Sequence, residues 1–454
     1  MSQANISFPI EPPVQALLEG IRRAGGRPLL VGGTVRDALL GHLPKDIDVE
    51  VFGLDGETLR QVAAHYGRVF AVGVSFGVLK VKLAGAGELD LSLPRRESLY
   101  DTGKGQRGFL ATPDPAMTPF EAASRRDFTI NAMYYDPAAG ELLDFFEGQR
   151  DLQDGILRHV GPAFAEDPLR VLRGMQFAAR WNFRVAPETA QFCAGLRPLY
   201  GTLAIERIWG EWHKLLLKGW LPSAGLEALT ACGWRSLYPP LEQLAGQAYS
   251  PGETAWEHTL RAVNAAAAIS ARYGLAGETR VVLMLATLCH DMDLPLVGAG
   301  GAVLDSAQAF LKAIGCPQHY LKPVLPLLRE RLAYRTPEGT APTATAVRRL
   351  SLRLAPATIE QWERLVEAAS QGAKETGNAR PALPWLELAR TLGCDRGPLP
   401  PLLLGRHLKE AGLHPGPRFG QLLEEALEAQ LEGRFSTTEE AMAWLKSRLA
   451  NNSS

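Results

Sequence analysis

The hydrophobic pattern of this chain changes near residue 150, and that change sets its fold class. Before it, segments in which polar and apolar residues alternate, such as 46–52 and 88–93, lie between short segments with helical spacing. After it, leucine, isoleucine, tryptophan and phenylalanine recur every three or four residues, as in amphipathic helices. The sequence therefore predicts an α+β chain, with a small mixed-sheet head followed by an all-α neck, body and tail.

Turn-forming segments divide the helical part of the chain. A length of 454 residues allows about three domains of ~150 residues each. The segment QAYSPGE, residues 247–253, marks a boundary, and a proline-rich stretch precedes the last helices. We expect the head over residues 1–150, the neck over 151–245, the body over 246–375 and the tail over 376–454.

The composition is that of a folded protein with almost no net charge. Hydrophobic residues make up 46% and charged residues 21%, which excludes wholesale disorder. The 48 Lys and Arg against 49 Asp and Glu give a net charge of −1, so any affinity for nucleic acid must come from a local basic surface.

Five widely spaced cysteines without a CxxC pair favour free thiols. Without a signal peptide or a long apolar run, we expect a cytoplasmic protein with no membrane partner.

The segment LLVGGTVRDALLGHLPKDIDVEVFG, residues 29–53, combines a glycine pair with two carboxylates. Gly32 and Gly33 close a predicted strand and open a helix, where backbone N–H groups can approach a triphosphate. Asp46 and Asp48 are two residues apart on the next strand, so their side chains point to one face. Hard cations prefer carboxylate oxygens, and this pair can share one or two Mg²⁺ ions.

From the residues alone, two interpretations of this segment are open. Two aspartates separated by one residue are common on the solvated face of an amphipathic strand, and glycine pairs are common in turns. A phosphate site is favoured by the cations nearby, because Arg36 on the first helical turn can hold phosphate oxygens and Lys45 and Lys82 add positive charge.

With these residues considered together, the segment resembles the signature of the nucleotidyltransferase superfamily that includes DNA polymerase β. More narrowly, it resembles the bacterial family of CCA-adding tRNA nucleotidyltransferases and poly(A) polymerases. The resemblance implies that Gly32 and Gly33 form the catalytic turn, and that Asp46 and Asp48 are the catalytic residues and hold Mg²⁺. Asp90, in the alternating segment ELDLSL, is either the third carboxylate of the superfamily or a residue of a polar strand face.

These residue types suit nucleotidyl transfer. The reaction is an in-line displacement at the α-phosphorus by a 3′-hydroxyl, and it needs no side-chain nucleophile. One metal ion activates the attacking oxygen and the other stabilises the leaving pyrophosphate, so carboxylates that position the metals are sufficient.

Residues 124–133, SRRDFTINAM, resemble the second motif of the same family. From their spacing alone, adjacent arginines before a strand more often form a solvated basic patch. The resemblance implies instead that Arg126, Asp127 and Asn131 contact the triphosphate and the ribose, with Arg125 beside them. Asp and Asn can serve the ribose because their side chains hydrogen-bond a 2′-hydroxyl.

The segment AEDPLRVLRG has both a structural and a functional interpretation. As a helix start, it has Asp167 as N-cap, Pro168 in the first turn and Arg170 as an i,i+3 partner of Asp167. It also resembles the EDxxR motif of the family, which implies that Glu166, Asp167 and Arg170 pair with the edge of the incoming base and choose CTP or ATP. Arg173, one turn later, joins this nucleotide-binding set.

Basic residues after the motif predict a surface for the tRNA acceptor end, and such binding is salt-sensitive. The set is Arg173, Arg180, Arg184, Arg207, Lys214 and Lys218. A glycine-containing loop between Pro94 and Pro115 resembles a flexible loop that the family needs for the switch to ATP. Its presence argues for addition of CCA or of A alone, and against an enzyme that adds only CC. The tail from Leu402 to Leu427 resembles the C-terminal region of the family, which implies contact with the tRNA elbow or packing against other helices.

The body resembles an HD domain, a helical phosphohydrolase fold that some members of the family carry. His258, His290 and Asp291 are its candidate metal ligands, and three ligands satisfy a catalytic transition-metal pattern. The further ligands of a working site are missing from the usual positions. Many members have glycine and lysine shortly after the His-Asp pair, and this chain has Asp293 and Leu294 there. The alternative is a helical body whose buried histidines are satisfied by their neighbours.

The resemblance as a whole implies template-independent addition of CCA to the 3′ acceptor end of tRNA, from CTP and ATP, with Mg²⁺. Within the family, the alternatives are an enzyme that adds only A or only CC, or a poly(A) polymerase. From other classes, the alternatives are an HD-type metal-dependent phosphohydrolase and a non-catalytic RNA-binding protein. The intact aspartate pair argues against the last, and no protein partner is implied.

Overall fold

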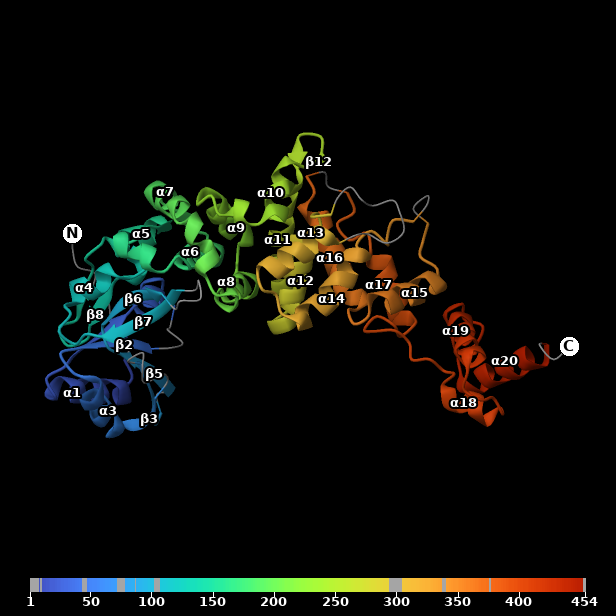
Figure 1. Cartoon of the computed structure of the whole chain (residues 1–454), viewed down its shortest axis with the longest axis horizontal. Coiled ribbons are helices and arrows are strands. Elements are labelled where there is room, and N and C mark those ends of the chain that lie inside the picture. Colours follow the sequence, from blue (N-terminus) through green and yellow to red (C-terminus); the bar gives the residue numbers. More distant parts are fainter. Residues whose placement is uncertain are drawn as a thin grey trace. The chain divides into compact units, whose positions relative to one another are not determined.

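The structure is a computed structural model, and it describes residues 8, 10–42, 47–71, 78–85, 87–101, 107–293, 304–336, 340–374 and 377–451. The chain divides into two compact units (Figure 1). The first consists of Met1–Leu215 with Ala224–Leu237, and the second of Leu216–Ser223 with Tyr238–Ser454.

A mixed seven-stranded sheet forms the centre of the first unit, with the strand order β3-β4-β5-β2-β1-β8-β9. Its strands are β1 (Arg27–Val31), β2 (Ile47–Phe52), β3 (Gly67–Ala71), β4 (Val78–Leu83), β5 (Gly87–Ser92), β8 (Tyr134–Asp136) and β9 (Glu141–Leu143). The pairing of β2 with β5 is parallel, and their other neighbours are antiparallel. Strands β6 (Arg95–Asp101) and β7 (Arg107–Pro113) form a separate hairpin.

Apolar stripes bring helices onto this sheet. Helix α1 (Pro12–Arg23) buries Val14, Leu17, Leu18 and Ile21, and it packs against α3 (Gly56–Ala64). The Asp55 carboxylate accepts hydrogen bonds from the first free N–H groups of α3 and so fixes its start. Helix α2 (Gly33–Leu39) follows β1 directly, and α4 (Pro119–Ser124) begins with a capping box.

The rest of the first unit is mainly helical. It contains α5 (Gly148–Asp154), α6 (Arg170–Trp181), α7 (Pro187–Gly195), α8 (Ile205–Lys218) and α9 (Pro222–Ala231), although the end of α8 and the first two residues of α9 belong to the second unit. The expectation that strands end at residue 150 was wrong in detail. Strands β10 (Ile156–Leu157) and β11 (Arg184–Val185) pair in parallel, because Gly155 turns the chain before the first of them and Asn182 ends α6 before the second.

The second unit is a helical array. Its helices are α10 (Pro239–Gly246), α11 (Ala255–Arg272), α12 (Gly277–Cys289), α13 (Asp305–Ala313), α14 (Gln318–Arg329), α15 (Ala344–Leu354), α16 (Ile359–Gly372), α17 (Leu383–Thr391), α18 (Gly405–Glu410), α19 (Pro417–Leu431) and α20 (Thr438–Asn451). Alanines of α11 allow α16 to approach closely, and a Cβ at Gly372 would lie 2.8 Å from the backbone nitrogen of Ala262. The segment QAYSPGE forms the short hairpin of β12 (Ala248–Ser250) and β13 (Glu253–Thr254).

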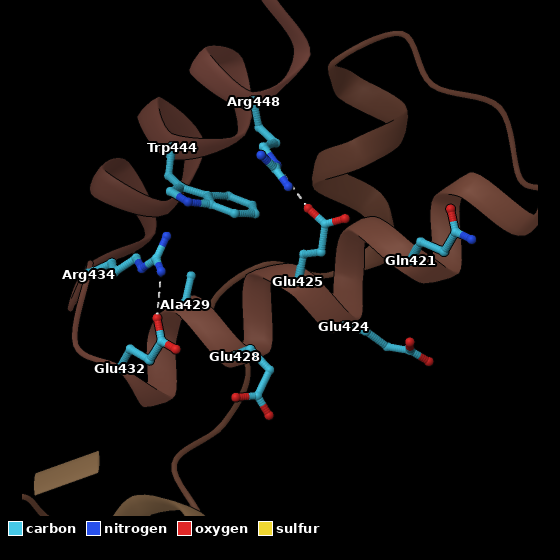
Figure 2. Close-up of a pocket in the computed structure, with 9 residues that line it drawn as sticks. All are labelled: Gln421, Glu424, Glu425, Glu428, Ala429, Glu432, Arg434, Trp444 and Arg448. Carbon is cyan, nitrogen blue, oxygen red and sulfur yellow. Dashed lines mark hydrogen bonds and ion pairs between the residues drawn. The ribbon is translucent and has the colours of Figure 1, made fainter. Parts of the chain in front are cut away.

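The last three helices have a small core of their own, which includes Leu408, Leu422 and Leu445. Beside it, a groove between α19 and α20 is lined by four glutamates, with Trp444 and two arginines opposite (Figure 2). Arg448 pairs with Glu425, so part of the charge is neutralised within the groove. Carboxylates repel phosphates, and we therefore do not expect this groove to contact the RNA backbone.

The α+β class, with a mixed-sheet head before a helical remainder, is confirmed. The finer division into head, neck, body and tail stays a prediction. No helix among the described residues combines the length and the apolar character that a membrane crossing requires. All five cysteines are free and buried.

Candidate active site and a buried histidine–aspartate cluster

The strand pairing places the carboxylates of Asp48 and Asp90 side by side. The other predicted catalytic aspartate, Asp46, lies outside the described residues. Asp48 on β2 is directly opposite Asp90 on the parallel neighbour β5, so the two side chains share one face of the sheet. The Asp48 N–H donates to the Thr34 hydroxyl at 2.8 Å, and Asp90 pairs with the Lys80 ammonium at 3.2 Å. Asp90, the candidate third carboxylate, therefore lies beside Asp48 on the same face of the sheet.

The glycine pair leaves room for charged groups at the end of β1. Gly32 has φ +62° and ψ −121°, a conformation that favours glycine, and a Cβ there would lie 3.3 Å from Nη1 of Arg126. A Cβ at Gly33 would lie 3.5 Å from Nη2 of Arg36 and 3.9 Å from Oδ2 of Asp48. The missing side chains therefore open a small space to which two guanidinium groups and the Asp48 carboxylate are adjacent.

Arg36 connects the first two predicted motifs. Its Nε and Nη2 donate to one oxygen of Asp37 at 2.9 and 2.7 Å, and its Nη1 donates to Asn131 at 2.6 Å. The Asn131 amide in turn donates to Asp127 at 3.0 Å. Burial lowers the pKa of Arg36 in spite of the Asp37 charge. The guanidinium carbon lies 4.1 Å from the centre of the Trp181 ring.

Asp127 is a buried carboxylate whose bonding partners are strong donors. Arg173 approaches it with two nitrogens, each at 2.8 Å, and the Phe128 N–H donates at 2.7 Å. Burial alone would raise the pKa of Asp127, but Arg173 and the hydrogen bonds from Asn131 and Phe128 outweigh it and hold the pKa at about 2. The carboxylate is therefore ionised at neutral pH and fixes Arg173, whose pKa the same pair raises.

Arg126 is held by a residue that the sequence analysis missed. Its Nη2 donates to Glu50 at 3.1 Å, and the Tyr134 hydroxyl donates to the same oxygen at 2.5 Å. Burial acts to lower the pKa of Arg126, but Tyr134 and Glu50 outweigh it and raise the pKa. Glu50 had a signal in the sequence, because it continues the spacing of Asp46 and Asp48 along the same strand face.

The carboxylates of the EDxxR segment are held by arginines from elsewhere in the chain. Arg125 donates to Glu166 at 2.6 Å, and Arg207 from α8 donates to Asp167 at 2.7 Å. The Arg170 Nη1 donates to the carbonyl oxygen of Ala163 at 2.8 Å. These partners come from 41, 40 and 7 residues away in sequence, so no local spacing signalled the first two.

The predicted helix start in this segment was wrong. Helix α6 begins at Arg170, with Leu169 in the N-cap position, because a 3₁₀ turn over Pro162–Glu166 and an extended Asp167 precede it. Asp167 still acts in part as a cap, since it accepts from the Leu169 N–H at 3.2 Å. Its ionic partner is Arg207 rather than Arg170.

Of the six basic residues expected to bind the tRNA acceptor end, three form ion pairs within the protein: Arg173, Arg207 and Lys214. Arg180 lies over the Trp181 ring, with 4.5 Å between the guanidinium carbon and the ring centre. Arg184 and Lys218 are exposed. The structure thus engages four of the six with other groups of the protein, and their contact with tRNA stays a prediction.

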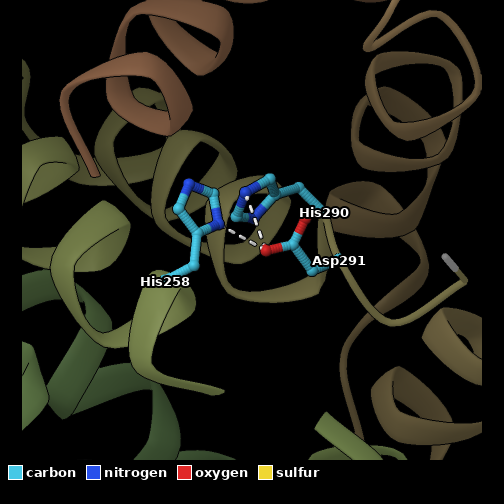
Figure 3. Close-up of side chains that lie close together, drawn as sticks. All are labelled: His258, His290 and Asp291. Atoms are coloured by element: carbon cyan, nitrogen blue, oxygen red, sulfur yellow. Dashed lines mark hydrogen bonds and ion pairs between the residues drawn. The ribbon is translucent and has the colours of Figure 1, made fainter. Parts of the chain in front are cut away.

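The second unit brings together the three predicted HD ligands (Figure 3). His258 Nδ1 lies 2.5 Å and His290 Nε2 lies 3.3 Å from the same oxygen of Asp291. The opposite nitrogens donate to backbone carbonyls, at 2.9 Å to Ala369 and 2.6 Å to Thr287. Since a carbonyl only accepts, each ring donates through that nitrogen and directs its other nitrogen toward the Asp291 carboxylate, as in sites where outer hydrogen bonds orient metal ligands.

The contacts of nearby residues explain why, among the described residues, only three side chains of this cluster could bind a metal ion. Asp293 is engaged elsewhere, because its carboxylate accepts from the N–H groups of Ser306 and Ala307 at the start of α13. Burial lowers the pKa of His290. Burial acts to raise the pKa of Asp291, but the two histidines and Arg331 outweigh it and lower the pKa. The cluster is thus a carboxylate with two imidazoles, and with a guanidinium nearby.

Comparisons with known proteins identify similar chains. The Poly A polymerase head domain matches residues 29–158. A multifunctional CCA protein from Nitrosococcus oceani is 40% identical over 270 residues, which are 58% of this chain and 62% of the relative. One from Xanthomonas oryzae pv. oryzae is 33% identical over 437 residues, 90% of this chain and 99% of the relative. The Bacillus stearothermophilus CCA-adding enzyme, solved in complex with CTP, shares the fold at TM-score 0.66 and 23% identity, over 98% of this chain and 99% of that one.

Proposed function

The chain belongs to the family of the multifunctional CCA proteins, and on this basis we propose that it adds C, C and A to the 3′ end of tRNA without a template. The observation that carries the proposal is the pairing of Asp48 with Asp90 next to the Gly32–Gly33 turn, with Arg36 and Arg126 beside it. This combination provides carboxylates for metal ions and guanidinium groups for a polyphosphate in one place.

The acidic strand face fits Mg²⁺. Asp48 and Asp90 supply oxygen ligands on adjacent strands, and Asp46 precedes Asp48 by the two residues that a shared face requires. When bound, Mg²⁺ lowers the barrier by activating the 3′-hydroxyl and by stabilising the leaving pyrophosphate. Arg126 is oriented by Glu50 to face Gly32, where it can hold a phosphate oxygen.

Nucleotide choice is assigned to the segment before α6. Asp167 offers acceptor oxygens and Arg170 offers a planar donor, and together they complement the hydrogen-bonding edge of cytosine or adenine. Arg207 holds Asp167 itself and Arg125 holds the neighbouring Glu166, so that the carboxylates are presented in a defined orientation. Asp127 and Asn131 serve the ribose and phosphates from the adjacent buried network.

CTP and ATP are the substrates and the tRNA acceptor end is the partner in this proposal. An enzyme restricted to A or to CC, and a poly(A) polymerase, are the alternatives within the family. The test uses purified protein, Mg²⁺ and tRNAs that end before the first C, after C, or after CC, with CTP or ATP supplied singly. Ordered extension to CCA and no further supports the proposal. Long A tails would assign poly(A) synthesis, and an absence of incorporation on all three tRNAs would overturn the proposal.

The histidine–aspartate cluster supports a second candidate function, metal-dependent phosphoester hydrolysis. His258, His290 and Asp291 would hold a transition metal ion, since their donor atoms converge and their other hydrogen bonds fix the rings. Metal content of the purified protein, compared with that of His290→Ala, tests the site. Hydrolysis of a 2′,3′-cyclic phosphate by the wild type but not by His290→Ala would support the activity, and equal metal content in the two proteins would remove it.

We place both activities in the cytoplasm. The five cysteines are buried and unpaired, which suits a reducing compartment.

A further inference from the structure

An aromatic side chain lies against the guanidinium that joins the glycine turn to the second motif. Trp181 is the last residue of α6, and its ring centre is 4.1 Å from the Arg36 guanidinium carbon. Phe177, one turn earlier, stacks on Trp181 with ring centres 5.1 Å apart and lies 5.6 Å from the same guanidinium. The flat face of Arg36 thus packs on an aromatic surface that α6 provides.

The edges of the Arg36 guanidinium are fixed as well. Asp37 takes two of its N–H groups and Asn131 takes a third. Of its five N–H groups, one on Nη1 and one on Nη2 have no acceptor among the residues that the structure describes. Nη2 is the atom that lies 3.5 Å from the Cβ position of Gly33, beside Asp48. A face contact and three edge contacts leave the guanidinium one orientation, with a donor directed to the glycine turn.

Three arginines of this network lie close to one another. Arg36, Arg173 and Arg180 lie together, and burial and the Arg36 charge lower the pKa of Arg180. Asp37 and Asp127 are the carboxylates that pair with them in the described structure. Each of the three guanidiniums lies over an aromatic ring of α6. Such rings tolerate cations at close range, so the aromatic face keeps like charges together until an anion arrives.

We propose that Trp181 is a positioning residue that holds Arg36 for the triphosphate of the incoming nucleotide. The inference rests on the proposed nucleotidyl transfer, and it adds to that reaction a residue outside the predicted motifs. Trp181 acts through Arg36 and makes no contact with the reacting atoms. An anion at the glycine turn would meet the remaining Nη2 donor of Arg36.

A purely structural role for Trp181 makes a different prediction. If the ring only packed the end of α6, then removing it would lower stability, and any loss of activity would follow the loss of folded protein. Phe183 provides the matched control, because its ring lies 5.8 Å from Trp181 and is more deeply buried, and no contact of Phe183 with Arg36 is seen among the described residues. A role through Arg36 must depend on ring character and on Arg36 itself.

The experiment measures steady-state incorporation of CTP into tRNA that lacks CCA, with the full chain. The variants are Trp181→Leu, Trp181→Phe, Phe183→Leu, Arg36→Lys and the double variant of Trp181→Leu with Arg36→Lys, each checked for folding by circular dichroism. We expect Trp181→Leu to raise the KM for CTP about 2- to 30-fold, the range of a cation–π contact, with kcat changed less than about twofold. Trp181→Phe should restore most of the affinity, and Phe183→Leu should keep the wild-type KM.

The double variant separates the two roles. Once Arg36→Lys has removed the planar group, the loss of Trp181 should add little, so the two effects on KM should be less than multiplicative. Multiplicative effects, an unchanged KM in Trp181→Leu, or an equal rise in Phe183→Leu would overturn the inference. If Trp181→Leu does not fold, Trp181→Met takes its place with the same expectations. If the wild type incorporates no nucleotide, the proposed function fails, whereas an active wild type with an unaffected Trp181→Leu refutes this inference alone.

Discussion

Replacing Asp127 by asparagine tests the buried network that surrounds the candidate nucleotide site. The pKa of this carboxyl is held at about 2, against an ordinary value of 3.8. One pKa unit corresponds to about 1.4 kcal/mol, so ionisation of Asp127 contributes about 2 kcal/mol to the stability of the first unit at neutral pH. Asparagine also leaves Arg173 without its partner. We therefore expect Asp127→Asn to lower the free energy of unfolding by about 2–4 kcal/mol at pH 7.

The pH dependence of the unfolding free energy tests whether ionisation of Asp127 is the source of this stability. Because the pKa of Asp127 is lower in the folded state, its contribution is fully present above the unfolded value of 3.8 and is lost as the pH falls towards 2. Between pH 6 and pH 3, the difference in unfolding free energy between wild type and Asp127→Asn should shrink by about 1 kcal/mol. Urea unfolding followed by tryptophan fluorescence measures this difference.

A second variant identifies the source of the effect. Arg173 is the strongest group that lowers the pKa of Asp127, so Arg173→Met should remove much of the pH-dependent stability while the carboxyl remains. A difference between wild type and Asp127→Asn that stayed constant from pH 6 to pH 3 would show that Asp127 is not held ionised by its neighbours. The same result would refute the assignment of Arg173 as its ionic partner.

Three further variants test the site and the packing that supports it. Asp48→Asn should abolish nucleotide incorporation while tRNA binding, measured by gel shift, stays detectable; full activity would contradict a metal-binding role. Asp167→Ala should reduce the ratio of correct to incorrect nucleotide incorporation more than the total rate, and unchanged selectivity in single-nucleotide assays would exclude base recognition by this residue. Gly148→Ala should destabilise the first unit by about 1–3 kcal/mol, because the new Cβ would clash with the carbonyl oxygen of Thr129, and an unaltered urea midpoint would argue against that contact.

Most of the fold could be predicted from local patterns in the sequence. Strands β2 and β5 alternate polar and apolar residues, and the glycines after β1 mark the end of a buried strand, so their positions follow from nearest neighbours in the sequence. The register between those strands does not follow from local patterns. It depends on tertiary packing, and it decides that Asp48 faces Asp90 rather than a residue of the opposite face.

Parts of the candidate site could not be predicted from the sequence, because they also depend on tertiary packing. The ion pairs of Glu166 with Arg125 and of Asp167 with Arg207 join residues about 40 positions apart. Helical spacing suggested Arg170 as the partner of Asp167, because residues three positions apart on one helix lie close enough to form an ion pair. The 3₁₀ turn before α6 changes that geometry, and α8 then supplies the partner.

On the roles proposed above, helix α6 links the choice of a base to the binding of phosphates. Its first turn follows Asp167 and carries Arg170, Arg173 reaches Asp127 from its second turn, and Trp181 at its end packs on Arg36. These contacts lie along one helix of 12 residues, which is stiff over that length. A displacement of the base-reading end must therefore be accommodated by the contacts with Asp127 and Arg36. Mispositioning of a wrong base would in this way disturb the groups that hold the triphosphate, so that selectivity appears in the rate of addition as well as in binding.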